Sequence, residues 1–258
     1  MEVDSFPVVQ RKKYQRAPKR KPTTEMQAKL NERKSKDLER RMAHLNYGEN
    51  DVAICLTFRD PVMRIDTPEN EARAKHEWEN FRRRLGRLYK KSGAVLKYMG
   101  QLQYTKGTGF HFHFYMTGGP QWQDIKDCWG LGRCYIDPLE FDENGIAGYV
   151  EYITKGGRYT KRWIASKNLI RPEPEIRDGK LKKDEMFLFQ IEDKEAISAL
   201  YPGYVCTEAH WEYNDLYGGQ YLRARFYKKG APFYYDQTAR KRKTKNPVPR
   251  MHANVKKC

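Results

Sequence analysis

The sequence has no long hydrophobic run. No apolar stretch approaches the roughly 20 residues that a membrane-spanning helix needs, and the first residues, MEVDSFPVVQRKKYQR, lack the apolar core of a secretory signal. Cysteine is also sparse: the chain has five, odd in number and without a partner Cys or His pair at zinc-finger spacing. They are Cys55, Cys128, Cys134, Cys206 and Cys258. We expect ordinary thiols of a reducing compartment, and hence a soluble, intracellular (cytoplasmic) protein with no membrane partner.

Acidic residues are missing from one end of the chain. Residues 237–258 hold 8 Lys/Arg and no Asp or Glu, and residues 1–47 hold 13 Lys/Arg against 6 acids. Residues 48–236 hold 29 against 27, so most of the formal net charge of +17 lies outside the middle. Basic ends around a nearly neutral domain favour a polyanionic partner, above all nucleic acid, because each neutralised phosphate releases counterions. Tails that are merely solubilising or unstructured are the alternative.

The same change of composition divides the chain into three parts. Residues 1–47 are predicted to be a basic N-terminal arm, disordered over 1–22 and with a possible helix over 24–46. Residues 48–236 show no internal linker and are predicted to form one continuous domain. Residues 237–258 are predicted to be a basic, disordered tail.

Within the middle part, strand patterns alternate with helix patterns. Thr67 and Pro68 are typical of a helix start. Strands are expected at 51–60, 94–104, 110–117 and 132–138, and helices at 68–91, 121–129 and 144–157. A helix over 181–200 and a terminal strand pair at 203–213 and 218–228 follow. This order predicts an α+β fold, with a central, mainly antiparallel sheet and flanking helices.

Two of the six histidines lie on either side of one phenylalanine in the stretch GFHFHFYMTGG, residues 109–119. Successive side chains of a strand alternate between faces, so His111 and His113 share one face and the neighbouring phenylalanines share the other. Two imidazoles placed in this way can both reach one divalent cation. An ordinary polar strand face is the alternative.

The strand before this one contains a candidate third ligand. The five-residue turn TKGTG folds residues 94–104 back beside the histidines, which brings the face of Gln101 and Gln103 next to them. An amide oxygen is an acceptable ligand but a weaker one than a carboxylate. Glutamines that only solvate the face are the alternative.

A second cluster of reactive side chains lies in YVEYITK, residues 149–155. On a helix, Tyr149, Tyr152 and Lys155 follow one another at three-residue spacing along one side. A tyrosine hydroxyl, with a free pKa of about 10, becomes a useful nucleophile where a cation stabilises the developing charge. The alternative is an amphipathic helix with half-buried tyrosines and a lysine that caps its C-terminal end.

Taken together, CLTFRD (55–60), HFHFYM (111–116) and YVEYITK (149–155) occur in an order that resembles the HUH endonuclease superfamily. The likeness covers roughly 48–170 and is greatest to rolling-circle replication initiators (Rep proteins) of phages, plasmids and single-stranded DNA viruses. The resemblance implies an RRM-like HUH endonuclease fold. It also implies an enzyme that nicks and rejoins single-stranded origin DNA through a 5′-phosphotyrosine intermediate, which leaves a free 3′-OH to prime rolling-circle replication.

The resemblance also implies roles for individual residues. His111 and His113 would bind Mn²⁺ or Mg²⁺, and Gln103 stands where this group often places a glutamate ligand. Tyr152 would be the nucleophile, with Lys155 as its helper and Tyr149 as a possible auxiliary. Many phage-type relatives carry two tyrosines four residues apart, whereas here the spacing is three, so a one-tyrosine enzyme is expected.

Partners follow from the same resemblance. Single-stranded DNA with a replication origin would be the substrate, inside a host cell whose replication machinery acts with it. No G-x-x-x-x-G-K-[ST] motif occurs in the sequence, so a separate helicase is expected. Candidate phosphate contacts are Arg82, Arg83, Arg84, Arg158, Lys161 and Arg162. A transposase or relaxase with the same chemistry and a non-catalytic single-strand-binding protein are the alternatives.

Overall fold

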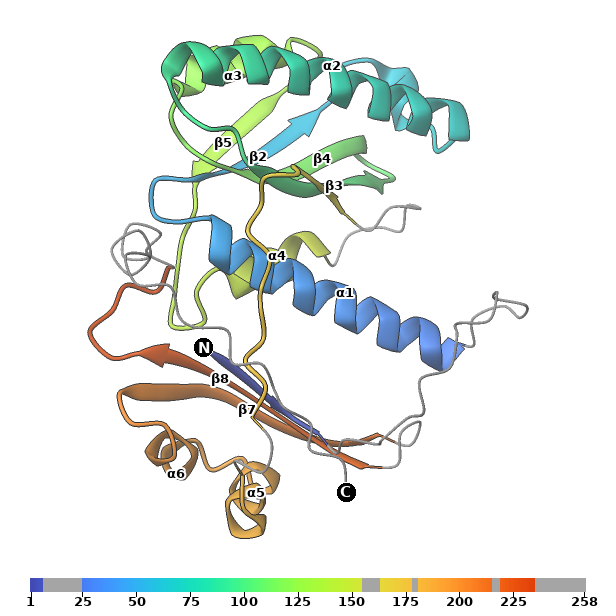
Figure 1. Cartoon of the computed structure of the whole chain (residues 1–258). Coiled ribbons are helices and arrows are strands. Elements are labelled where there is room, and N and C mark those ends of the chain that lie inside the picture. The colour runs from blue at the N-terminus through green and yellow to red at the C-terminus, as the bar shows by residue number, and fades with distance from the viewer. Residues whose placement is uncertain (7–24, 155–162, 178–180, 215–218, 235–258) are drawn as a thin grey trace, which may run out of the picture.

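A five-stranded sheet lies at the centre of the computed structural model, which describes residues 1–6, 25–154, 163–177, 181–214 and 219–234 (Figure 1). The strand order is β5-β2-β4-β3-β6, and every neighbouring pair is antiparallel. The strands are β2 (Val52–Thr57), β3 (Tyr98–Thr105), β4 (Gly109–Met116), β5 (Cys134–Pro138) and β6 (Ile164–Ala165). The predicted α+β class is therefore confirmed, and the sheet with its flanking helices is consistent with an RRM-like fold.

Helices α2 (Pro68–Ser92) and α3 (Trp122–Trp129) cover one face of this sheet (Figure 1). The side chain of Thr67 accepts a hydrogen bond from the backbone of Asn70 and so caps α2 at its predicted start. A single 3₁₀ turn, Pro61–Arg64, precedes the helix. Between α2 and the sheet, the ring of Trp78 stacks on that of Phe114, with centroids 3.8 Å apart. This layer is a closed aromatic core.

Helices α1 (Glu25–Asn46) and α4 (Ala147–Thr154) cover the opposite face. The possible N-terminal helix is thus present, and its last turns are part of a hydrophobic core. Residues that α1 and α4 bury against the sheet include Met42, Ala43, Val150 and Ile153. Gly156 and Gly157, which were expected to end α4, lie outside the described residues. Among the described segments, no helix combines the length and the apolar character that crossing a bilayer requires.

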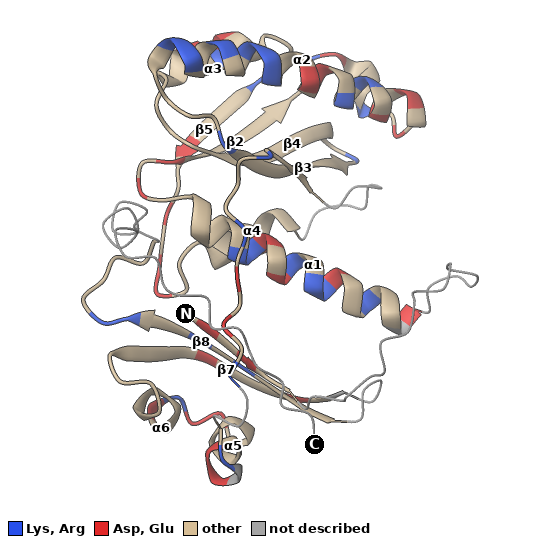
Figure 2. Ribbon diagram, in the orientation of Figure 1, with Lys and Arg blue, Asp and Glu red and all other residues tan. Residues whose placement is uncertain are grey.

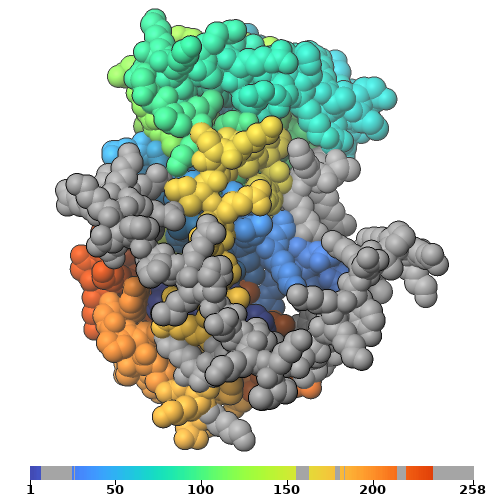
Figure 3. Space-filling model, in the orientation of Figure 1, coloured from blue at the N-terminus to red at the C-terminus, as the bar shows by residue number. Residues whose placement is uncertain are grey.

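A second sheet of three strands lies below α1 in Figure 1, in the order β1-β8-β7. Two short helices pack on it, where one helix over 181–200 was expected. Its elements are β1 (Glu2–Ser5), β7 (Tyr204–Asn214), β8 (Gly219–Lys228), α5 (Lys183–Gln190) and α6 (Lys194–Ala199). From β6 the chain runs toward this sheet through residues 166–177, which cross the surface shown in Figure 3. The terminal strand pair is confirmed, but it belongs to this separate sheet.

The N-terminal residues are not the disordered arm that we predicted for 1–22, as far as the structure describes them. Glu2–Ser5 form strand β1, which pairs antiparallel with β8. The physical reason is the pairing partner: β8 offers a free edge, and arginines nearby neutralise the two acids of β1. Residues 7–24 and the predicted tail, 237–258, lie outside the described residues.

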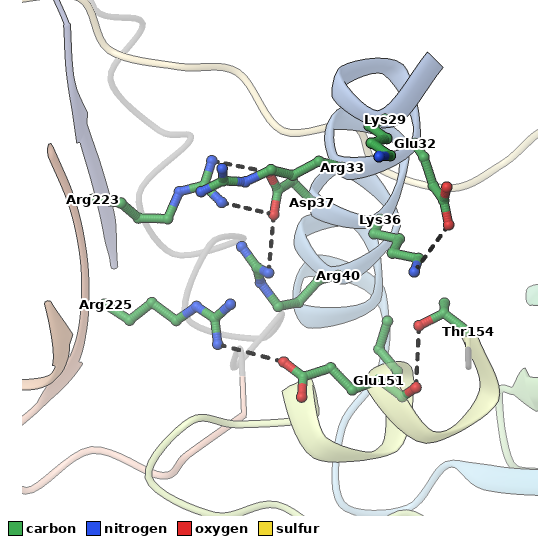
Figure 4. Close-up of a pocket in the computed structure, with 11 residues that line it drawn as sticks. Lys29, Glu32, Arg33, Lys36, Asp37, Arg40, Glu151, Thr154, Arg223 and Arg225 are labelled. Carbon is green, nitrogen blue, oxygen red and sulfur yellow. Dashed lines mark hydrogen bonds and ion pairs between the residues drawn. The ribbon is translucent and has the colours of Figure 1, made fainter. Parts of the chain in front are cut away.

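Ion pairs connect α1 to the three-stranded sheet (Figure 4), and both elements carry residues of either charge (Figure 2). Arg40, whose side chain is 6% exposed, contacts Glu2 at 2.9 Å and Asp37 at 3.1 Å. Arg223 of β8 contacts Asp37 at 2.9 Å. Together with α4 these elements line a hollow of about 460 Å³. The three-stranded sheet is therefore attached to α1 mainly through ion pairs, whereas the five-stranded sheet is attached to it through apolar packing.

Candidate active site

The histidine pair lies on β4, the central strand of the five-stranded sheet, on the face covered by α4. The antiparallel register places His111 between Thr57 of β2 and Gln103 of β3. It places His113 between Cys55 and Gln101 in the same way. Two polar rows therefore cross the middle of the sheet, which confirms the predicted alternation of β4.

The two imidazoles lie close together and are held in a defined orientation. Their ring centroids are 5.2 Å apart, with the rings nearly perpendicular at 83°. Nδ1 of His111 lies 2.9 Å from the carbonyl oxygen of Gly109. A carbonyl oxygen only accepts, so the proton of this bond is on Nδ1 and the lone pair of the neutral ring is on Nε2.

Burial keeps both imidazoles in the form that binds metals. Desolvation, together with a smaller effect of the neighbouring His111, lowers the pKa of His113 to about 4. Desolvation also lowers the pKa of His111, against the effect of its hydrogen bond to Gly109. Both rings are therefore neutral at pH 7, which is the state in which imidazole coordinates a cation.

Helix α4 presents Tyr152 to this pair. Val150 and Ile153 are buried and hold the helix on the sheet, whereas the side chain of Tyr152 is 65% exposed. Its ring lies 6.1 Å from the ring of His113, in an edge-to-face arrangement at 87°. The structure thus brings together the three side chains that the sequence analysis singled out, and it leaves the tyrosine accessible from outside.

Tyr149 occupies a different environment on the same helix. Its ring packs 5.8 Å from that of Tyr115 and 6.4 Å from that of Tyr152. Desolvation raises the pKa of its hydroxyl above the ordinary value, and Cys55 and Asp137 add to the effect. A phenol that is harder to ionise is a poorer nucleophile at neutral pH, and the one-tyrosine enzyme stays a prediction.

Gln101 and Gln103 make a contact that the sequence analysis did not predict. Both are buried, at 6% and 4% exposure, and both direct their side-chain amide nitrogen at the carbonyl oxygen of Ile153. The distance is 2.5 Å for Gln101. The amide oxygens remain the ligand-capable atoms of these side chains. No signal in the sequence shows where α4 ends relative to β3, and the contact depends on that placement.

The possible metal ligands of the site are the imidazoles of His111 and His113 and the amide oxygens of Gln101 and Gln103. Among the described residues no group of three or more His, Cys, Asp and Glu side chains is placed to hold a metal ion. The site offers two neutral imidazoles and amide oxygens beside them. This set fits a divalent cation that completes its coordination with oxygens from outside the chain, such as those of a phosphate.

The basic residues predicted to contact DNA fall into two groups. Arg158, Lys161 and Arg162 lie outside the described residues, as does Lys155, the predicted helper of Tyr152. Arg82, Arg83 and Arg84 lie on α2, beyond the sheet from the histidines (Figure 2). Arg82 pairs with Glu79 at 2.7 Å, and Nε of Arg84 donates to the carbonyl oxygen of Cys128 at 2.7 Å. The structure therefore does not bring the α2 arginines to Tyr152.

One buried acid near the site was missed by the sequence analysis. Glu39 of α1 is 2% exposed and accepts a hydrogen bond of 2.8 Å from the hydroxyl of Tyr115, two residues after His113. Burial raises the pKa of Glu39 to about 7. Its position three residues before Met42 on a helix was the available signal, because that spacing places it on the buried side.

The fold and the site together define a mixed α/β protein, consistent with an RRM-like fold, with paired histidines on a central strand facing a tyrosine on a covering helix. Residues 51–157 match the model of a family described as Replication-associated protein ORF2. This match spans β2 to α4, including all three motifs, and fits a rolling-circle Rep protein, as the resemblance predicted. It implies interaction with DNA at a replication origin. No curated protein and no solved structure matches the chain.

Proposed function

We propose that this protein is a replication-initiator endonuclease of the HUH type, which nicks and rejoins single-stranded origin DNA through Tyr152. The observation that carries the proposal is the exposed Tyr152 ring, 6.1 Å from the ring of His113, within the segment that matches a replication-associated family. An exposed phenol beside a neutral imidazole pair is an arrangement suited to phosphoryl transfer, because the nucleophile and the cation-binding groups share one phosphate.

In this mechanism the phenolic oxygen of Tyr152 attacks the scissile phosphorus and gives up its proton. The new bond joins that oxygen to phosphorus, and the bond from phosphorus to the 3′ oxygen breaks. The 3′ oxygen takes up a proton and becomes the free 3′-OH, while the 5′ side stays attached as a phosphotyrosine. Attack by a 3′-OH on the phosphotyrosine reverses the step and rejoins the strand.

His111 and His113 would hold Mn²⁺ or Mg²⁺, which when bound offsets the negative charge on the phosphate. The hydrogen bond from His111 to the carbonyl oxygen of Gly109 fixes its ring and leaves the lone pair of Nε2 available for a ligand. Lys155, two residues beyond Ile153, would offset charge on the phosphorus as it is attacked. Unwinding of the origin would come from a separate helicase of the host.

The test is a search for the covalent adduct. The full chain is incubated with origin-bearing single-stranded DNA and Mn²⁺, and the products are separated by denaturing electrophoresis. We expect an adduct with the unmodified chain and none with Tyr152→Phe, because that change removes only the attacking hydroxyl. DNA binding of the variant, measured in parallel, should be unchanged.

Tyr149→Phe is the matched control, since it removes the same atom from the neighbouring tyrosine. We expect this variant to form the adduct. An adduct that persists in Tyr152→Phe and disappears in Tyr149→Phe would assign the nucleophile to the other residue. An unmodified chain that binds the DNA but forms no adduct would contradict the enzyme and leave a single-strand-binding protein.

A further inference from the structure

The end of α4 is held by the strand that lies beside the histidines. Ile153 is the last residue but one of α4 within the described residues. Its oxygen accepts from the amide nitrogens of both Gln101 and Gln103. These residues pair with His113 and His111, respectively, across β3 and β4. Two hydrogen bonds therefore connect the histidine rows to the carbonyl group of Ile153, the residue directly after Tyr152.

Burial makes this connection stiff. Gln101 and Gln103 are 6% and 4% exposed, and the side chain of Ile153 is among the most buried of the chain. Hydrogen bonds in such surroundings are electrostatically stronger than in water, and a buried acceptor that loses both donors is costly. The backbone at Ile153 cannot move away from β3 without breaking them.

We propose that Gln101 and Gln103 form a positioning clamp, in which their amides fix the Ile153 carbonyl and thereby the distance of Tyr152 from the histidine pair. This proposal rests on the proposed function, for which it names the positioning residues. The two glutamines act through the backbone of α4 and need not touch DNA. Their effect is on the rate of attack, because a displacement of about 1 Å at a reacting centre can cost roughly 100-fold in rate.

The clamp also accounts for the amide at position 103, where the group that the sequence resembles often has a glutamate. A carboxylate has no proton to donate to a carbonyl oxygen at neutral pH. Its negative charge would also lie against that oxygen in a buried setting, where an unpaired charge is strongly disfavoured. The Ile153 contact therefore requires the amide, whereas binding of a cation alone would favour the acid.

The experiment measures single-turnover cleavage of origin-bearing single-stranded DNA at saturating DNA and Mn²⁺. The variants are Gln101→Leu, Gln103→Leu, the double variant and Gln103→Glu, with Gln123→Leu of the distant helix α3 as the control. Each single leucine variant leaves one donor on Ile153, so we expect a loss of about fivefold from one hydrogen bond. The double variant should lose about 100-fold, more than the product of the singles, because the two donors share one acceptor. DNA binding should stay within about twofold of the unmodified chain, since neither amide contacts the strand.

Gln103→Glu separates the clamp from a ligand role. Under the clamp this variant cleaves slowly even when Mn²⁺ is saturating, whatever its affinity for the metal. If Gln103 served only as a ligand, the glutamate would bind Mn²⁺ more tightly and cleave at least as fast as the unmodified chain. Cleavage by Gln103→Glu at the unmodified rate therefore overturns the clamp, as does a double variant no slower than the product of the singles.

Hydrogen exchange of the α4 amides provides a readout that does not need activity. In the double leucine variant, exchange over 147–154 should speed up by at least tenfold, while exchange in α2 stays as it was. Unchanged exchange in α4 overturns the clamp. If the unmodified chain forms no adduct but α4 loosens in this way, the proposed reaction fails and the clamp on α4 stands.

Discussion

One face of the five-stranded sheet is closed by aromatic rings, whereas the other carries imidazoles, amides and a buried carboxyl. Strand β4 contributes to both: Phe112 and Phe114 contact Trp78 of α2, and His111 and His113 face α4. A strand alternates its side chains, so one short segment can stabilise the fold and build the site at once. The comparison shows that one face is given to packing, whereas the other combines a second hydrophobic core with the candidate site. Changes to the aromatic core and to the site residues should therefore have separable effects.

The largest expected effect comes from opening the aromatic face. Trp78→Ala removes the ring that stacks on Phe114 and leaves a large cavity. We expect a loss of about 3–5 kcal/mol in the free energy of unfolding, measured by chemical denaturation. Tyr152→Phe, on the other face, should change it by less than about 0.5 kcal/mol, because that side chain is mostly exposed.

Trp78→Phe is the matched control for the aromatic face. It keeps an aromatic ring and removes an indole N–H that has no hydrogen-bond partner among the described residues. We therefore expect Trp78→Phe to lower the free energy of unfolding clearly less than Trp78→Ala does. Equal losses in the two variants would show that ring stacking does not hold this face together.

A smaller, pH-dependent effect is expected from the buried acid on the other face. The pKa of Glu39 is raised from 4.5 to about 7 in the folded chain, so its contribution to stability is complete below pH 4.5 and is lost as the pH rises through 7. Glu39→Gln imitates the neutral carboxyl and can still accept from Tyr115. We expect this variant to exceed the unmodified chain by about 1–3 kcal/mol in unfolding free energy at pH 8, with little difference at pH 5.

The difference in unfolding free energy between the two chains at each pH reports on this carboxyl alone, because the lowered pKa values of His44 and His113 affect both chains alike. Glu32→Gln, an exposed glutamate of the same helix, should show no such pH-dependent gain. A gain for Glu39→Gln that is the same at pH 5 and pH 8 would contradict a raised pKa.

The smallest effect is expected from α2, whose exposed Arg83 lies beyond the aromatic face. If Arg83 contacts a DNA phosphate, Arg83→Gln weakens binding and lowers the salt slope of the affinity by about one unit. The cleavage rate at saturating DNA should not change. Arg82→Gln is the control, because that guanidinium already pairs with Glu79. A slower cleavage step in Arg83→Gln would show that α2 lies close to the reacting strand.

Helices and strands that depend only on residues near one another in the chain could be predicted from the sequence. The alternation of β4 places its histidines and phenylalanines on opposite faces, and the cap at Thr67 marks the start of α2, as the structure shows. Periodicity and capping depend on neighbours in the chain, so they are visible without a fold. The approach of Tyr152 to His113 was predicted from the order of the motifs, and the structure brings their rings together.

Features that depend on distant partners could not be predicted. Strand β1 is four residues of mostly polar sequence, and its conformation comes from pairing with β8 more than 200 residues away. Glu39 belongs to a charge-rich helix that was predicted to be part of an N-terminal arm, yet Tyr115 and the sheet bury it. The contact of Gln103 with Ile153 depends on where α4 ends over the sheet. Roles for Lys155, Arg158, Lys161 and Arg162 remain predictions.

The pairing of β1 with β8 has a consequence for biosynthesis. All strands of the five-stranded sheet have been synthesised once residue 165 has left the ribosome. The three-stranded sheet is complete only when residue 228 has been synthesised. At about 5–20 residues per second, β1 stays without its neighbour for on the order of ten seconds or longer. During that interval the two acids of β1 keep a polar edge exposed to water, which protects the nascent chain against aggregation.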